Sequence, residues 1–304
     1  MIQMTELSKT ILEKYQIRKT KKQKSQFISL MQAHFPEMTI QQKGNVRNLV
    51  FGDVEKASMV LGAHYDTCAR LPFPNFIMPK SPVLSILYGL VALIPVFLVV
   101  ALINLGLFFC DVDFDTRWLI SVSTVCAAMV LMIVGPANKH TVNDNTSGVI
   151  TLCELMVHLS ASEKRKVAFV LFDREETGMQ GSSLFRKRYK KSMADKLLVN
   201  FDCVSDGDHI MVAASKAARK KYTKQLDQAF QPTDTKAIVQ INAERVYFPS
   251  DQHNFNCSVV IGALHKKPFI GYYLNKIHTK RDTVMDKTNI KLLCDSILRL
   301  IRIM

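Results

Sequence analysis

The chain has 304 residues, 48% of them hydrophobic, so it can form one large domain or two small domains with a substantial core. Its formal net charge of +14 favours an anionic partner, but no nucleic-acid-binding motif accompanies the charge, and we expect no nucleic-acid partner. The seven cysteines are scattered without a C-x-x-C pair, which argues against a disulfide framework and against a thiolate zinc site.

The first part of the chain predicts two helices followed by two strands. Apolar residues recur at helical spacing over residues 4–15 and 25–35, and short apolar runs at 45–52 and 57–66 are typical of strands. Between the helices, the basic stretch from Arg18 to Lys24 fits a solvated helix face and a surface against anionic headgroups equally well.

Two uncharged runs then interrupt this pattern. The first, residues 83–109, is long enough to cross a bilayer, since about 20 helical residues span the hydrocarbon core. The second, residues 118–134, is near the lower limit and ends at a Gly-Pro pair, with Trp118 placed for an interface. We predict a transmembrane helical hairpin within residues 81–137, and the alternative is a buried helical hairpin in a soluble protein.

The charges beside the hairpin predict its orientation. Arg70, Lys80 and Lys139 lie on the side of the main domain, whereas the connecting loop carries only Arg117. This difference favours a cytoplasmic main domain on a multi-pass cell-membrane protein with two helices. Unpaired cysteines and a polar N-terminal stretch without a secretory signal agree with that orientation.

The rest of the chain alternates between helices and strands. Helical patterns cover residues 147–162, 182–191, 215–230 and 289–304, and strand patterns cover 166–173, 196–202, 236–241 and 258–264. We predict an α/β fold with a mixed, mainly parallel central sheet flanked by helices. The main domain then comprises residues 1–80 and 138–304, and the hairpin at 81–137 is an insertion.

Carboxylates and imidazoles follow the predicted strands, where the crevice of an open α/β sheet lies. These residues are His64, Asp66, Asp144, Glu175, Glu176, Asp202, His278 and Asp282. Because clustered acids resist ionisation, a bound divalent cation would relieve their repulsion. A set of imidazoles and carboxylates suits a catalytic zinc site.

The spacings within this set indicate a division of roles. His64 and Asp66 share one face of an extended segment, so one can bind metal while the other orients it. Of the adjacent Glu175 and Glu176, one can bind metal while the other acts as general base. Asp144 precedes a helix and could bridge two metals roughly 3.5–4 Å apart.

The order of the motifs resembles the zinc aminopeptidases of metallopeptidase family 28 (clan MH). That family's motifs run H-x-D, D-N-x-S-G, E-E-x-G-x-x-G-S, a strand-ending Asp, S-D-x-x-x-F and H-T-x-x-D. The chain has HYD at 64–66, DNTSG at 144–148, EETGMQGS at 175–182, NFD at 200–202, SDQHNF at 250–255 and HTKRD at 278–282. The resemblance covers about 40–70 and 140–304 and implies a zinc-exopeptidase-like fold.

The resemblance also implies a site with two zinc ions per chain. It assigns one zinc to His64 and Asp202, the second to Glu176 and His278, the bridge to Asp144, the general base to Glu175, and the orientation of His64 to Asp66. The chain departs from the family in two places. The hairpin fills a connection that is usually short, and Gln252 stands where many relatives have histidine, with His253 next.

The function implied is that of a membrane-anchored di-zinc aminopeptidase. Its substrate is a peptide with a free N-terminus, attacked by a hydroxide that bridges the metals. Tyr247, Tyr272 and Tyr273 are equivalent candidates for oxyanion stabilisation. The oligomeric state, the natural substrate and the preferred N-terminal residue stay open.

Two other functions are compatible with the same motifs. One is a glutaminyl-cyclase-like zinc transferase, but that branch uses one zinc and a tryptophan in its pocket. The only tryptophan here, Trp118, lies in the hairpin. The other is a non-catalytic, peptidase-like binding protein, which typically loses metal ligands that are all present here. Two zinc ions per chain indicate the peptidase, one the cyclase, and none the binding protein.

Overall fold

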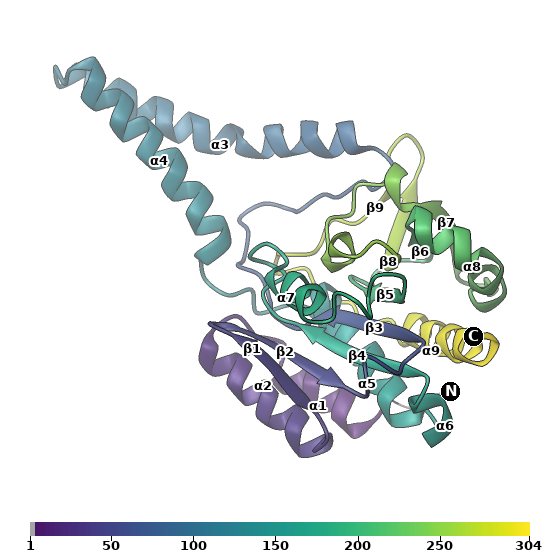
Figure 1. Ribbon diagram of the computed structural model, residues 1–304. Helices are drawn as coiled ribbons and strands as arrows, with labels where there is room; N and C mark the ends of the chain where they lie inside the picture. Colours follow the sequence, from purple (N-terminus) through teal and green to yellow (C-terminus); the bar gives the residue numbers. More distant parts are fainter. Residues whose placement is uncertain (1–3) are drawn as a thin grey trace.

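The computed structural model describes residues 4–304, and its centre is a mixed sheet of nine strands in the order β1-β2-β4-β3-β5-β8-β6-β7, with β9 on β8 (Figure 1). The strands are β1 (Thr39–Lys43), β2 (Val46–Phe51), β3 (Met59–His64), β4 (Val167–Phe172), β5 (Leu197–Phe201), β6 (His209–Ala214), β7 (Ala237–Asn242), β8 (Ser258–Lys267) and β9 (Gly271–Tyr273). The four central strands β4-β3-β5-β8 are parallel, whereas β1, β2 and the β6–β8 pair are antiparallel. The predicted α/β fold with a mixed central sheet is confirmed.

Helices cover both faces of the sheet. They are α1 (Glu6–Lys14), α2 (Lys21–His34), α5 (Ser147–His158), α6 (Ala161–Lys164), α7 (Gln180–Arg188), α8 (Lys216–Ala229) and α9 (Lys287–Ile303). Strand β3 shows how the two faces arise, because alternate side chains of a strand point in opposite directions. Met59, Leu61 and Ala63 join the core under α1, α2, α5 and α9, while Val60 joins the core under α7.

Six of the nine strands coincide with strand patterns predicted from the sequence, and three do not. The prediction missed β1, which is largely exposed and has no apolar face, and β9, which has only three residues. It also missed β6, whose five apolar residues are all buried. Periodicity alone cannot show whether a short apolar run is a strand or part of a buried helix. In the structure, β6 is a strand because it pairs with β7 and β8.

Helices α3 (Pro82–Phe109) and α4 (Phe114–Val134) form a hairpin that projects from the body (Figure 1). Both are long and apolar enough to cross a membrane, and neither contains a buried residue. The hairpin is therefore not buried within this chain, since the apolar side chains of both helices face outward rather than into the protein core.

The two ends of the basic stretch at residues 18–24 differ from the prediction, whereas Lys21 and Lys22 between them are exposed. Arg18 is fully buried, and its Nε donates to the carbonyl oxygen of Tyr65 at 2.5 Å. Lys24 is 8% exposed and forms an ion pair with the buried Asp173. Neither side chain belongs to a solvated helix face, because each is buried and pairs with groups inside the body.

Candidate metal centre and active site

The ends of three parallel strands bring the first group of polar residues together. His64 is the last residue of β3, and Asp202 directly follows β5. Glu175 and Glu176 lie in the turn between β4 and α7. Since the carboxyl ends of neighbouring parallel strands lie at one edge of the sheet, these four side chains meet in one crevice.

Two loops complete the cluster from other directions. Asp144 lies in the turn Val142–Thr146, directly before α5, and is 4% exposed. His278 lies in the loop between β9 and α9 and has a positive φ of 59°. A non-glycine residue in this left-handed region is held there by its surroundings, and such residues concentrate at functional sites.

Asp144 stands between two imidazole–carboxylate groups. Its Oδ1 lies 3.3 Å from His64 Nε2, and its Oδ2 lies 2.9 Å from His278 Nε2. His64 Nε2 is also 3.8 Å from Asp202 Oδ1, and His278 Nε2 is 3.3 Å from Glu176 Oε2. The structure thus gathers all five residues that the motifs single out as metal ligands into two groups that share one carboxylate.

The charges in this cluster perturb one another strongly. Burial, together with the charge of Asp144, raises the pKa of Glu176 to about 8. Burial opposes the charging of His278, but the carboxylates of Glu176 and Asp144 outweigh it and raise the pKa of that imidazole to about 9. The raised pKa values favour protonated side chains in this cluster. A bound divalent cation would replace those protons and stabilise the carboxylates and neutral imidazoles as ligands.

The residues present fit zinc. Their donors are imidazole nitrogens and carboxylate oxygens, which zinc binds in catalytic sites. The Oε1 atom of Glu176 is buried without a hydrogen-bond partner, although buried polar atoms are nearly always paired. A cation in the cluster would give this oxygen a partner.

Asp66 supports two parts of the cluster through different atoms. Its backbone carbonyl oxygen lies 3.1 Å from Nδ1 of His64, so the other ring nitrogen faces Asp144. Its carboxylate accepts hydrogen bonds from the backbone N–H groups of Glu175 at 2.9 Å and Glu176 at 3.3 Å. Asp66 therefore orients the imidazole through its backbone and positions the Glu175–Glu176 turn through its side chain.

The turn that carries Asp144 is held by another buried carboxylate. Asp282 Oδ1 accepts from Asn143 N at 2.6 Å, and Oδ2 accepts from Asp144 N at 3.0 Å. Burial and the charge of Asp144 raise the pKa of Asp282 to about 8, although these two donors favour its charged form. The final aspartate of HTKRD thus links the loop of His278 to the turn of Asp144.

A cavity of about 240 Å³ opens onto the cluster. It is lined by Asn75, Ile77, Asp144, Glu175, Glu176, Asp202, Cys203, Phe248, Pro249, Ile277 and His278. Glu175 faces this space, and burial raises the pKa of its carboxyl group well above the usual range. The three tyrosines considered for oxyanion stabilisation are not among the lining residues.

The SDQHNF segment, residues 250–255, places Asp251 rather than Gln252 or His253 in a buried, unpaired position. Gln252 donates to the carbonyl oxygen of Phe248 at 2.8 Å, and His253 is exposed, so neither lines the cavity. Asp251 is fully buried with both carboxylate oxygens unpaired, and burial raises its pKa to about 7. The motif signalled this residue, but its chemistry follows only from its surroundings.

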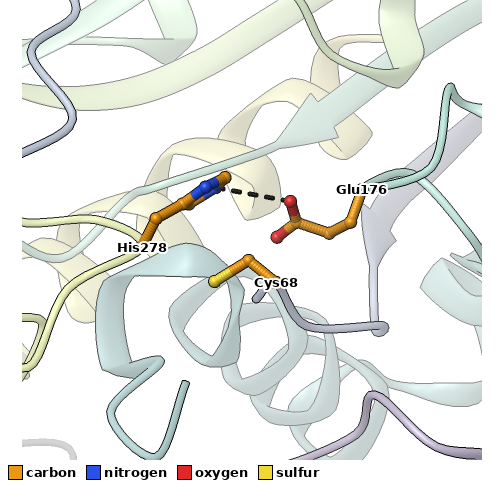
Figure 2. Close-up of side chains that lie close together, drawn as sticks. All are labelled: Cys68, Glu176 and His278. Carbon is orange, nitrogen blue, oxygen red and sulfur yellow. Dashed lines mark ion pairs between the residues drawn. The ribbon is translucent and has the colours of Figure 1, made fainter. Parts of the chain in front are cut away.

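Sequence analysis also missed Cys68. Its side chain lies beside Glu176 and His278 (Figure 2), and one ligand atom from each lies within 4.8 Å of the others. Cys68 is 2% exposed, and burial together with the charge of Glu176 raises the pKa of its thiol well above the usual range. Nothing in the spacing of the cysteines indicates this location.

Comparison with known families identifies the chain. The sequence model described as Peptidase family M28 matches residues 124–301, more than half of the chain. The chain belongs to peptidase family M28. This M28 protein is accordingly a zinc metallopeptidase, a hydrolase whose substrates are peptides. No curated protein matches the chain.

Solved structures share the fold of this M28 peptidase. The LapA aminopeptidase of Legionella pneumophila is 13% identical, with 97% of this chain and 68% of that chain covered and a TM-score of 0.55. A Zn-dependent exopeptidase from Parabacteroides distasonis is 12% identical, with 97% and 94% covered and a TM-score of 0.53. The glutaminyl cyclase of Macrostomum lignano is 11% identical, with 97% and 87% covered and a TM-score of 0.53. At such identities the likeness shows the fold alone.

Proposed function

We propose that this M28 peptidase is a membrane-anchored di-zinc aminopeptidase. The observation that carries the proposal is the position of Asp144, which turns one carboxylate oxygen toward His64 and the other toward His278. His64 and Asp202 would hold one zinc ion, Glu176 and His278 would hold the second, and Asp144 would contact both. Bound zinc would supply the Lewis acidity that activates water and polarises the substrate carbonyl.

Glu175 is the general base in this proposal. It faces the cavity beside the proposed ligands, and Asp66 holds its backbone N–H. Burial raises the pKa of its carboxyl group well above the usual range. A group that accepts and then donates a proton works best when its pKa is near the working pH, so this shift suits the role. Glu175 would take a proton from the attacking water and return it to the leaving amine.

The cavity suits the N-terminus of a peptide. Of the carboxylates that line it, Glu175 lies outside the proposed set of zinc ligands and would attract a positively charged amine, because opposite charges attract more strongly in a buried site. Ile77, Phe248 and Ile277 form an apolar part of the lining. This side of the cavity would accommodate an apolar N-terminal side chain.

The variant Glu175→Gln tests the proposed base. It should keep its zinc and lose at least about 100-fold in kcat, since a general base contributes about 10²–10⁴-fold. The measurement is hydrolysis of amino-acyl fluorogenic amides with zinc content determined on the same sample. The matched control is Glu55→Gln, at an exposed residue outside the cavity. Full activity of Glu175→Gln refutes the role of Glu175.

Zinc content distinguishes the proposed peptidase from its alternatives. Two ions per chain favour the aminopeptidase, one favours a glutaminyl-cyclase-like transferase, and none favours a binding protein. The cyclase reading gains no support from Trp118, which is 63% exposed on α4 and does not line the cavity.

The membrane part of the proposal has α3 and α4 crossing the bilayer. Arg70, Lys80 and Lys139 flank the hairpin beside the body, against Arg117 at its tip, which favours a cytoplasmic body. In this proposal residues 1–80 and 138–304 form the peptidase domain, and residues 81–137 form the insertion.

Cys110 provides a natural probe of this orientation. It is exposed between α3 and α4, at the end of the hairpin away from the body. An impermeant maleimide should label it in intact cells, and Cys110→Ser should abolish the labelling. Labelling that requires permeabilised cells places the hairpin tip inside and overturns the orientation.

A further inference from the structure

We infer that Cys68 supplies a thiolate ligand to the zinc ion held by Glu176 and His278. The inference rests on the proposed function for the presence of that ion. Figure 2 shows the three side chains, drawn from three separate segments, converging on one point. A sulfur, a nitrogen and a carboxylate oxygen of this trio all lie within 4.8 Å of one another.

This spacing agrees with the dimensions of a zinc site. Zinc binds thiolate sulfur at about 2.3 Å and imidazole nitrogen at about 2.0–2.1 Å. At a tetrahedral angle these bond lengths place the sulfur and the nitrogen about 3.6 Å apart. The three donor atoms can therefore reach one ion with small side-chain adjustments.

The backbone holds Cys68 and His278 in fixed relation. The carbonyl oxygen of Cys68 accepts a hydrogen bond from Asn138 N at 3.2 Å, and Asn138 Nδ2 donates to the carbonyl oxygen of Thr279 at 3.0 Å. Leu71 N donates to the carbonyl oxygen of His278 itself at 2.8 Å. Such preorganisation is what a metal site requires of the segments that carry its ligands.

An independent observation indicates that a cation belongs beside the thiol. The side chain of Glu176 is 9% exposed, and its buried Oε1 atom has no hydrogen-bond partner. A carboxylate oxygen buried in this way costs free energy unless a donor or a metal ion satisfies it. Cys68 and His278 flank this carboxylate, so the site is built around an unsatisfied ligand rather than around a lone cysteine.

A thiolate ligand would make the two metal positions unequal. With Asp144 shared, the second ion would have four protein ligands, namely Cys68, Asp144, Glu176 and His278. The ion of His64, Asp144 and Asp202 would have three protein ligands, the number that is usual in catalytic zinc sites. Zinc can expand to five ligands, so the ion beside Cys68 could still contact the attacking hydroxide. Sulfur at this second position would select zinc over harder ions such as Mg²⁺ and Mn²⁺.

X-ray absorption at the zinc edge tests the inference on the wild-type full chain. The zinc-loaded, detergent-solubilised protein should show a sulfur neighbour at about 2.3 Å from zinc. A chain that binds one or two zinc ions with only nitrogen and oxygen neighbours overturns the role of Cys68 and leaves the proposed peptidase standing. A chain that binds no zinc overturns both.

A cobalt-substituted pair of variants provides the second readout. Cobalt-loaded wild type should show thiolate-to-cobalt charge-transfer absorption in the near ultraviolet, and Cys68→Ser should lose it. The matched control is Cys257→Ser, at a buried cysteine that belongs to none of the metal-ligand groups. Cys68→Ser should also bind zinc at least about 10-fold more weakly. A charge-transfer band retained in Cys68→Ser refutes the assignment.

Discussion

Asp282→Asn tests whether the turn that carries Asp144 is held in place by a buried carboxylate. Asp282 is 1% exposed, and its two oxygens accept from Asn143 N at 2.6 Å and Asp144 N at 3.0 Å. Asparagine offers one acceptor oxygen in place of two. One of the two backbone donors would consequently be left without a partner inside the protein.

The size of the effect follows from that lost partner. An unpaired buried donor costs about 1–3 kcal/mol. Removing the outer partner of a metal ligand typically reduces metal affinity or activity by 10–100-fold, which corresponds to about 1.4–2.8 kcal/mol. Because the two ranges agree, we expect Asp282→Asn to bind zinc about 10–100-fold more weakly than the wild type.

Competition with a chromophoric zinc chelator measures this change directly. The matched control is Asp295→Asn, since Asp295 forms a surface ion pair with Lys291 on α9, and such pairs contribute about 0–1 kcal/mol. Equal zinc affinity of Asp282→Asn and Asp295→Asn would refute the reasoning, because the Asp144 turn would then keep its geometry without the carboxylate.

Three further predictions concern the body of the enzyme. Lys24→Met should lower the free energy of unfolding by about 3 kcal/mol, as measured by denaturant titration. This value is the low end for breaking a buried ion pair, because Asp173 keeps the hydrogen bond from the backbone N–H of Arg47. The double variant Lys24→Met/Asp173→Asn should recover part of the loss, because it leaves no unpaired buried charge. Burial raises the pKa of Asp206, but hydrogen bonds from His265 and Lys276 outweigh it and lower the pKa. Asp206→Asn should therefore destabilise the protein at neutral pH. In unfolding measurements at several pH values, its difference from the wild type should begin to shrink at about pH 4, the ordinary pKa of an aspartate, and should be lost as pH falls through the lower pKa of Asp206 in the folded protein; a difference unchanged at low pH contradicts this. Chelation should abolish peptidase activity and added zinc should restore it, whereas restoration by Mg²⁺ alone would contradict the donor set.

The strand ends were the most predictable part of the site. His64 is the last residue of one buried apolar run, and Asp202 directly follows another. Runs of this kind are easily recognised in a sequence. Once the runs are read as parallel strands, geometry requires their carboxyl ends to meet. That argument places polar residues in one crevice without any knowledge of side-chain positions.

Contacts between distant segments were not predictable in the same way. Cys68 lies beside Glu176 and His278, and Asn138 links its segment to the loop of His278 by hydrogen bonds. Arg18 reads as part of a basic surface stretch, yet it is buried and donates to Tyr65. Composition and periodicity predict the environment in which a residue type is usually found. They do not predict which residue from a distant segment will contact a particular side chain and bury it.

The two ends of the α3–α4 hairpin are held together by backbone pairing. Ala69 and Ala137 form an antiparallel bridge, and Arg70 N donates to the carbonyl oxygen of Pro136 at 2.8 Å. The chain therefore leaves and re-enters the body at one point, between the segments of His64 and Asp144.

The segment that precedes α3 links the cavity to the hairpin. Ile77 lines the cavity and forms a two-way backbone pairing with Leu274, at 2.9 and 3.0 Å. Tyr88 of α3 donates to the carbonyl oxygen of Pro74 at 2.6 Å, so the start of the helix packs on the segment that borders the site. If α3 crosses the bilayer, the cavity opens close to the membrane surface. Peptide N-termini held near that surface would then reach the site at a higher effective concentration than peptides free in solution.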